Sequence, residues 1–189
     1  MHMKKLLSIC FVCMSFVSVF GQIDNTDNHT VTVIIPEVAL LDLESAGLKN
    51  FTMNFTAPTE EGLGIGNPDD NEDVWLNYTS IIKPSTIAAG RTINVKTQAA
   101  PPGGINFTVK AAPYSGIGGG GTPGTRVNSN LTISTTPINI ITGIKSCFTG
   151  NGPTNGHKLT YGATTGPAGY SGLVSGTKTV NIIYTLTDN

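Results

Sequence analysis

A short acidic run offers the first set of side chains that could bind a metal ion. Asp69, Asn71 and Asp73 occupy the first, third and fifth positions of a calcium-loop pattern, and hard oxygen atoms are the ligands that Ca²⁺ prefers. The pattern then breaks, because Val74 stands where the loop needs glycine and Ser80 stands where it needs glutamate. We therefore expect a solvated acidic loop and no metal cofactor.

The chain shows no arrangement of residues suited to catalysis. Beyond residue 21 its histidines are His29 and His157, and neither has a cysteine or carboxylate neighbour at metal-ligand spacing. We expect both to be exposed turn residues. The glycine run at residues 116–121 matches a nucleotide-binding fingerprint but lacks its strand-to-helix context and its later acidic residue. With no convergent acid, base and nucleophile, the protein is predicted not to be an enzyme.

Aromatic side chains are a second kind of candidate binding group, because they can stack on sugar rings. Trp75 and Tyr78 are the two candidates for glycan stacking, and they lie in a predicted strand with apolar neighbours. Such neighbours favour positions in the core or at its rim. Glycan stacking by Trp75 and Tyr78 stays the alternative.

The N-terminal segment predicts export from the cytoplasm. Residues 1–5 carry positive charge, residues 6–20 are apolar, and a candidate cleavage site precedes Gln22. An apolar run of about 15 residues is too short to span a bilayer of about 30 Å. We expect residues 1–21 to be a signal peptide and the mature chain to be secreted, at the cell surface or outside the cell, with no membrane span.

Composition favours strands over helices. The chain has 23 glycines, 11 prolines and only 12% charged residues, which suits short strands joined by turns. Cys147 is the only cysteine beyond residue 21, so an internal disulfide is excluded in the mature chain and packing must supply the stability. We expect one all-β domain.

Charge is divided unevenly along the sequence. Residues 22–73 hold eleven carboxylates and one lysine, whereas residues 74–189 hold eight basic residues and one carboxylate. Two interpretations stay open. The acidic stretch is a solvated loop on a weakly basic domain, or the two regions attract each other in head-to-tail contacts or within one chain.

Alternating apolar residues predict where the strands lie. Val31, Val33 and Ile35 share one face of a predicted strand at residues 30–35, and Pro36 interrupts it, which is typical of an edge strand or a bulge. Residues 57–73 are predicted to form a loop. Further apolar or alternating segments cover residues 38–43, 51–55, 74–78, 92–97, 105–111, 131–134, 138–144, 158–161 and 177–186.

The spacing of these segments predicts a β-sandwich. Residues 101–104, with the sequence Pro-Pro-Gly-Gly, are expected to join the strands at 92–97 and 105–111 as a hairpin. We divide the mature chain into an N-terminal extension at residues 22–45 and a sandwich domain at residues 46–189.

Several of these segments together resemble the small pilins of the chaperone–usher type. The mature chain is most similar to colonisation-factor-type pilins and to spore-coat-protein-U-like secreted subunits. The resemblance is carried by residues 30–43 with Pro36, by residues 76–79 (Leu-Asn-Tyr-Thr), by residues 92–111, and by residues 170–184.

The resemblance implies an incomplete immunoglobulin-like sandwich that is finished by donor-strand exchange. In such pilins the N-terminal extension of a neighbouring subunit fills a groove by β-strand addition. Residues 30–35 match the donor segment, which would make Val31, Val33 and Ile35 the donor-strand plug. The implied partners are copies of the same chain or related pilin subunits, with a periplasmic chaperone and an outer-membrane usher as further candidates.

These observations lead to one expected function and one alternative. The expected function is a secreted structural subunit of a fimbrium, another surface filament or a biofilm matrix, assembled by strand complementation and without a nucleic-acid partner. In the alternative, residues 30–35 pair within their own chain, and the protein is a monomeric secreted module that binds a glycan or surface polymer.

Overall fold

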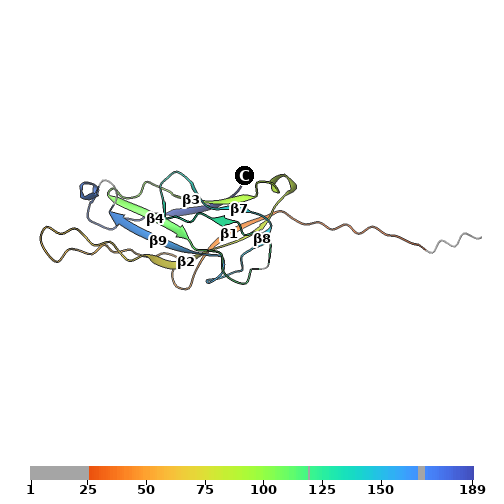
Figure 1. Ribbon diagram of the computed structural model, residues 1–189, viewed down its shortest axis with the longest axis horizontal. Helices are drawn as coiled ribbons and strands as arrows, with labels where there is room; N and C mark the ends of the chain where they lie inside the picture. Colours follow the sequence, from red (N-terminus) through yellow and green to blue (C-terminus); the bar gives the residue numbers. More distant parts are fainter. Residues whose placement is uncertain (1–25, 119, 166–168) are drawn as a thin grey trace, which may run out of the picture. The chain divides into compact units, whose positions relative to one another are not determined.

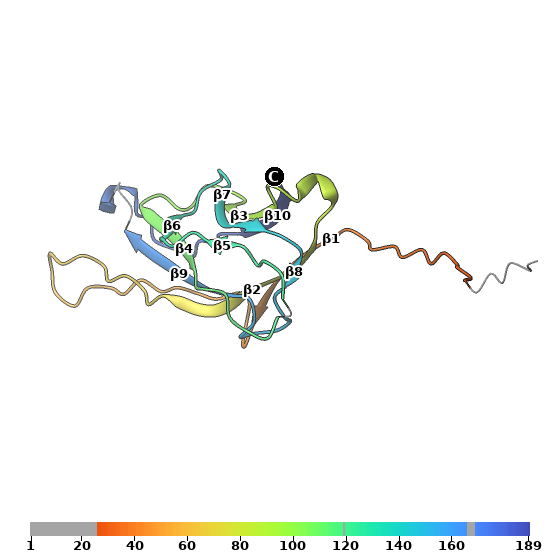
Figure 2. The same ribbon diagram turned by 45° about the vertical axis from the view of Figure 1, so that its right-hand side comes forward.

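The computed structural model describes residues 26–118, 120–165 and 169–189. The predicted signal peptide and its cleavage site lie outside the described residues. The chain divides into two compact units, one ending at Ile34 and the other covering residues 35–189. The second unit contains the strands β1 to β10 of the described residues and is drawn in Figures 1 and 2.

The second unit consists of two antiparallel sheets packed together, which confirms the predicted all-β sandwich (Figures 1 and 2). In the first sheet the order is β1-β2-β9-β4-β6, and β8 also pairs with β2. Its strands are β1 (Val38–Ser45), β2 (Asn71–Ile81), β4 (Ile105–Ala111), β6 (Leu131–Thr132), β8 (Cys147–Phe148) and β9 (His157–Thr165).

The second sheet has the order β10-β3-β7-β5. Its strands are β3 (Arg91–Thr97), β5 (Thr125–Arg126), β7 (Ile138–Ile144) and β10 (Ile182–Asp188). Short 3₁₀ turns at Pro84–Thr86 and Gly169–Gly172 are the helical elements of the described residues, and no helix there is long and apolar enough to cross a membrane.

The core lies between the two sheets and is built from alternate residues of their strands. Burying one such large aliphatic side chain stabilises the fold by about 1.5–3 kcal/mol. Completely buried members include Leu76, Val109 and Leu159 from the first sheet and Ile93, Val95 and Ile140 from the second. Cys147 is also buried and is a free thiol.

The predicted hairpin between residues 92–97 and 105–111 is wrong. These strands are β3 and β4, and they belong to different sheets, so residues 101–104 cross from one layer to the other. Each strand instead pairs with a strand far away in the sequence. β3 pairs with β10 over seven residues, and β4 pairs with β9 over seven residues. The two prolines of the connection also lack the N–H groups that a hairpin ladder uses.

Three segments with a strand-like pattern form less strand than the sequence predicts. Residues 30–35 form no strand, and residues 51–55 form none either. The last strand begins at Ile182 and not at residue 177. Residues 30–35 contain the exposed apolar side chains of Val31, Val33 and Ile35. Residues 52–55 and 177–180 line the candidate site described below.

Candidate functional site

Strands β1 and β10 are the last strands on one side of their sheets. Among the described residues, β1 pairs only with β2, and β10 pairs only with β3. An edge strand leaves one row of N–H and C=O groups free to pair with another chain. Leu41 and Leu43 of β1 and Tyr184 and Leu186 of β10 nevertheless pack on the core, so the sandwich is closed along these strands.

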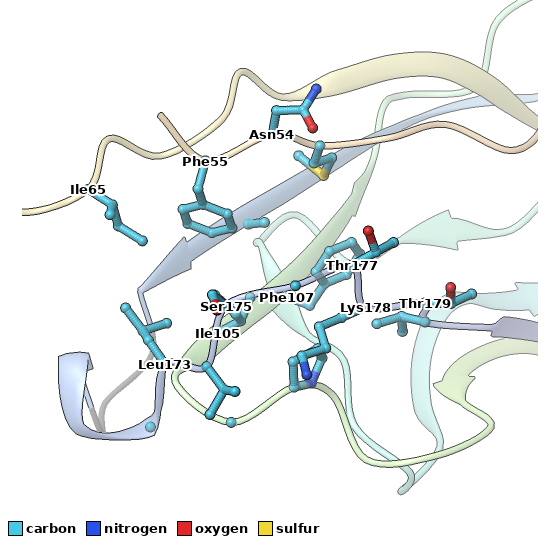
Figure 3. A pocket seen from close by; sticks show the side chains of 18 of the residues that line it. Asn54, Phe55, Ile65, Ile105, Phe107, Leu173, Ser175, Thr177, Lys178 and Thr179 are labelled. Carbon is cyan, nitrogen blue, oxygen red and sulfur yellow. The ribbon is translucent and has the colours of Figure 1, made fainter. Parts of the chain in front are cut away.

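Next to these two strands the sandwich opens into a groove of about 1090 Å³ (Figure 3). One wall is formed by residues 52–55, which follow β1, together with Ile65. The opposite wall is formed by residues 173–180, which precede β10. The apolar side chains of Ile105 and Phe107 of β4 and Ala163 of β9 also line the groove, whereas its walls carry polar side chains such as Asn54, Thr177 and Lys178.

The two walls have the sequence pattern of strands, but neither pairs with a strand of the described residues. On either side of residues 52–55, Phe51 packs on Tyr161 of β9 with ring centroids 5.1 Å apart, and Thr56 makes an isolated bridge to Gly66. Directly after the second wall, the carbonyl oxygen of Asn181 accepts a hydrogen bond of 2.9 Å from the backbone N–H of Gln98, which follows β3. The groove therefore lies between two segments that can pair with an added strand.

The three predicted plug residues are strongly exposed. Val31, Val33 and Ile35 are 71%, 76% and 73% exposed, and Ile34 between them is 86% exposed. Such a run of apolar side chains in water is costly unless a partner covers it.

The structure confirms the core position favoured for Tyr78 and corrects the exposed turn predicted for His157. Tyr78 is only 3% exposed and presents no open ring face to a sugar, whereas Trp75 on the same strand is half-buried. His157 is buried as the first residue of β9 and is not an exposed turn residue; His29 is exposed. The Tyr78 hydroxyl lies 3.0 Å from His157 Nε2, and His157 Nδ1 lies 2.9 Å from the carbonyl oxygen of Ala112.

The buried position of His157 has an electrostatic consequence. Burial lowers the pKa of this histidine, because the charged imidazolium would lose its hydration. Alternate residues of β9 from His157 to Ala163 are all buried, so extending the predicted strand at 158–161 by one residue identifies this histidine as a core residue.

Two of the three candidate calcium ligands, Asn71 and Asp73, contact each other. Asn71 belongs to β2 and bonds to Asp73 through a 3.4 Å contact from its amide to the carboxylate, and Asp69 is exposed. Within the described ranges, no group of three or more histidine, cysteine or acidic side chains is placed to hold a metal ion.

Comparison with known proteins supplies no relative: no family model, no curated protein and no solved structure matches the chain. The resemblance to chaperone–usher pilins therefore stays an expectation. What the site can do must be inferred from the groove, from its two unpaired walls and from the exposed residues 31–35.

Proposed function

We propose that the protein is a structural subunit that joins copies of itself by β-strand complementation into a surface filament or matrix. The observation that supports this most is that one chain carries both halves of such a joint. It has a groove bordered by two unpaired, strand-like walls, and it has an exposed apolar segment with strand alternation at residues 31–35.

The chemistry of the two halves is complementary. An added strand supplies main-chain hydrogen bonds to the groove walls, and alternate side chains fill the apolar space between them. Val31, Val33 and Ile35 provide three such side chains, and covering each contributes about 1.5–3 kcal/mol. Lys178 on one wall and Asp27 in the N-terminal segment carry opposite charges, which favours their approach.

The connection to β1 favours exchange between copies over pairing within one chain. Only Pro36 and Glu37 separate Ile35 from Val38, the first residue of β1. A two-residue hairpin loop needs positive φ at one or both loop positions, which selects glycine or asparagine. Proline has φ fixed near −65°, so residues 30–35 are poorly suited to folding back beside β1. This disfavours the monomeric alternative.

Export and assembly partners are part of the same proposal. Residues 1–21 have the composition of a signal peptide, which supports secretion to the cell surface. An open apolar groove favours premature aggregation, so a periplasmic chaperone and an outer-membrane usher are reasonable assembly partners. The proposed role is mechanical and not enzymatic.

Deleting residues 22–36 tests the proposal. The truncated chain keeps the groove but lacks the donor segment, so it should stay monomeric in size-exclusion chromatography. It should also bind a synthetic peptide with the sequence of residues 26–36. The control peptide carries Val31→Asp, Val33→Asp and Ile35→Asp and should not bind. A truncated chain that is a stable monomer and ignores both peptides would contradict strand complementation.

A further inference from the structure

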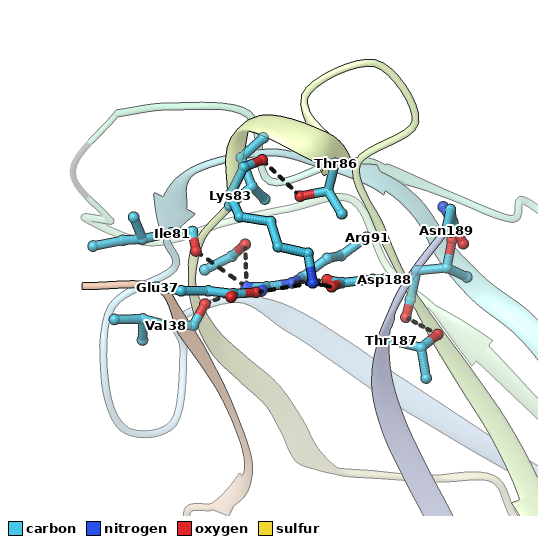
Figure 4. A network of polar contacts seen from close by, with 12 residues as sticks. Glu37, Val38, Ile81, Lys83, Thr86, Arg91, Thr187, Asp188 and Asn189 are labelled. Atoms are coloured by element: carbon cyan, nitrogen blue, oxygen red, sulfur yellow. Dashed lines mark hydrogen bonds and ion pairs between the residues drawn. The ribbon is translucent and has the colours of Figure 1, made fainter. Parts of the chain in front are cut away.

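A fully buried arginine lies at the point where the N-terminal segment joins the sandwich. Arg91, the first residue of β3, is 2% exposed and is the largest of the fully buried side chains in the described part of the chain. Its Nε donates to Asp188 Oδ1 at 2.6 Å, and its two other nitrogens donate to the Glu37 carboxylate and to the carbonyl oxygen of Val38 (Figure 4).

Further groups complete this network. Lys83 Nζ lies 2.7 Å from the second carboxylate oxygen of Asp188 and 3.9 Å from Glu37 Oε1. The Ser80 hydroxyl lies 3.3 Å from Arg91 Nη1. Two cations thus face two carboxylates, so the buried guanidinium is fully paired, as a buried charge must be.

The network joins the start of β1, the end of β10 and an interior strand. Glu37 directly follows Pro36, which ends the donor segment, and directly precedes β1. Asp188 is the last residue of β10, the strand that continues from the groove wall at residues 173–180. Arg91 belongs to β3, which lies inside its sheet between β10 and β7.

This position matters when the N-terminal segment is pulled. Without the network, tension on residues 26–36 would act on Val38, the first residue of an edge strand whose sheet partner in the described part of the chain is β2. Such a strand can be peeled off one residue pair at a time. With Glu37 and the Val38 carbonyl both bonded to Arg91, the same tension passes to an interior strand of the other sheet.

We infer that Arg91, Glu37 and Asp188 form a mechanical anchor that transmits tension from the N-terminal segment into β3 and keeps β1 from being peeled away. The inference rests on the proposed function, because only chains linked through their N-terminal segments place tension on that segment. It adds a role for residues outside the groove and the plug.

Single-molecule pulling on the mature chain, with handles at its two termini, tests the anchor. Glu37→Gln removes the charge of a side chain that is 43% exposed, so this variant should fold, which circular dichroism checks. Hydrogen bonds to charged groups are the strong ones, and we expect the lifetime of the intact state at constant force to fall about tenfold. The control is Glu44→Gln, the same change on β1 outside the network, which should leave the lifetime unchanged.

Equal lifetimes for the wild type and Glu37→Gln, or an equal loss in both variants, would overturn the anchor. The measurement uses isolated molecules, so it is independent of assembly. A chain that fails to polymerise but shows the predicted loss would refute the filament and not the anchor. Normal filaments with unchanged lifetimes would refute the anchor alone.

Discussion

His157 couples the stability of the core to pH. Its imidazole is buried beside Tyr78 and Tyr114, with ring centroids 6.0 Å from each, and burial lowers its pKa below the ordinary value of 6.5. Below pH 6.5 this histidine therefore binds a proton in the unfolded chain, whereas in the folded chain it stays neutral until a lower pH. By linkage, the stability present above pH 6.5 is lost as the pH falls toward the folded-state pKa.

Urea unfolding between pH 7.5 and pH 5 should show this loss of stability, within a range set by the ordinary histidine pKa of about 6.5. The variant His29→Gln, at an exposed position, should lose stability to the same extent as the wild type. His157→Gln should be less stable at pH 7.5 and should show a smaller change with pH. If both variants keep the full pH dependence, the titrating group is not His157.

Gly104 places one wall of the groove. Its φ is +79°, and a β-carbon there would lie 2.9 Å from backbone atoms of Gly172 and Leu173, so the turn before β4 and the start of the groove wall are in backbone contact. Gly104→Ala should destabilise the fold by about 1–2 kcal/mol through the left-handed backbone alone.

Gly47→Ala is the matched control, because nothing lies within 4 Å of the added carbon and no positive φ is required. Its effect should stay within about 0.5 kcal/mol. Thermal unfolding of both variants measures the difference. Equal midpoints would mean that the contact between Gly104 and the groove wall does not constrain the fold.

At the scale of elements, the apolar alternation of residues 30–35 should decide which side chains matter for assembly. Val33 lies on the predicted plug face, and Ile34, which is even more exposed, lies on the other face. Losing one buried valine costs about 1.5–3 kcal/mol, so Val33→Asp should weaken the joint at least tenfold, whereas Ile34→Asp should preserve it. Analytical ultracentrifugation compares the two. Equal effects would contradict strand pairing by this segment.

Local sequence predicted strands better than it predicted their partners. The segments at 92–97, 105–111 and 138–144 match β3, β4 and β7 closely, because each is apolar or alternating and is bounded by turns. The hairpin between the first two was wrong because pairing depends on segments far away in sequence. The predicted strand at 177–186 begins only at Ile182, since alternation permits a strand but a neighbouring strand is needed to form one.

The groove and the arginine network were beyond sequence reasoning for the same cause. The groove walls come from residues near 53 and near 176, and the network joins Glu37 and Asp188, at the two ends of the domain, to Arg91 between them. No local pattern connects residues so far apart. The candidate plug residues were predictable because they lie within one short segment.

At the scale of the whole molecule, the uneven charge is partly neutralised within the fold. Glu72 and Glu37 from the acidic stretch pair with Lys158 and Arg91 from the basic one. Other acidic residues of residues 57–73 are exposed, and so is Lys178 in the groove wall. The remaining opposite charges can still steer one copy toward another.

Salt should therefore slow assembly without dissolving finished assemblies. The Debye length is about 8 Å at physiological ionic strength, so surface charges act mainly on encounter, and the buried apolar residues hold the joint. Light scattering started at about 20 mM and about 500 mM salt tests this. Equal assembly rates at the two salt concentrations would mean that the uneven charge serves only to solvate the surface. The absence of assembly at both concentrations would favour the monomeric binding module.

The central claim, that residues 31–35 of one copy enter the groove of another, is tested most directly by cross-linking two single-cysteine variants. Val33→Cys alone and Thr177→Cys alone cannot join plug to groove within one chain, so a bond between them in a mixture must connect two copies. The native Cys147 is buried, and the wild type serves as its control. In the control mixture Ile87→Cys takes the place of Thr177→Cys, because Ile87 is exposed and is not among the groove-lining residues.

We predict that oxidation of the Val33→Cys and Thr177→Cys mixture yields a covalent dimer, and that the mixture of Val33→Cys and Ile87→Cys yields little. Mass spectrometry of the digested dimer should join the peptide that contains residue 33 to the peptide that contains residue 177. No dimer, or equal yields in the two mixtures, would contradict strand complementation through this groove.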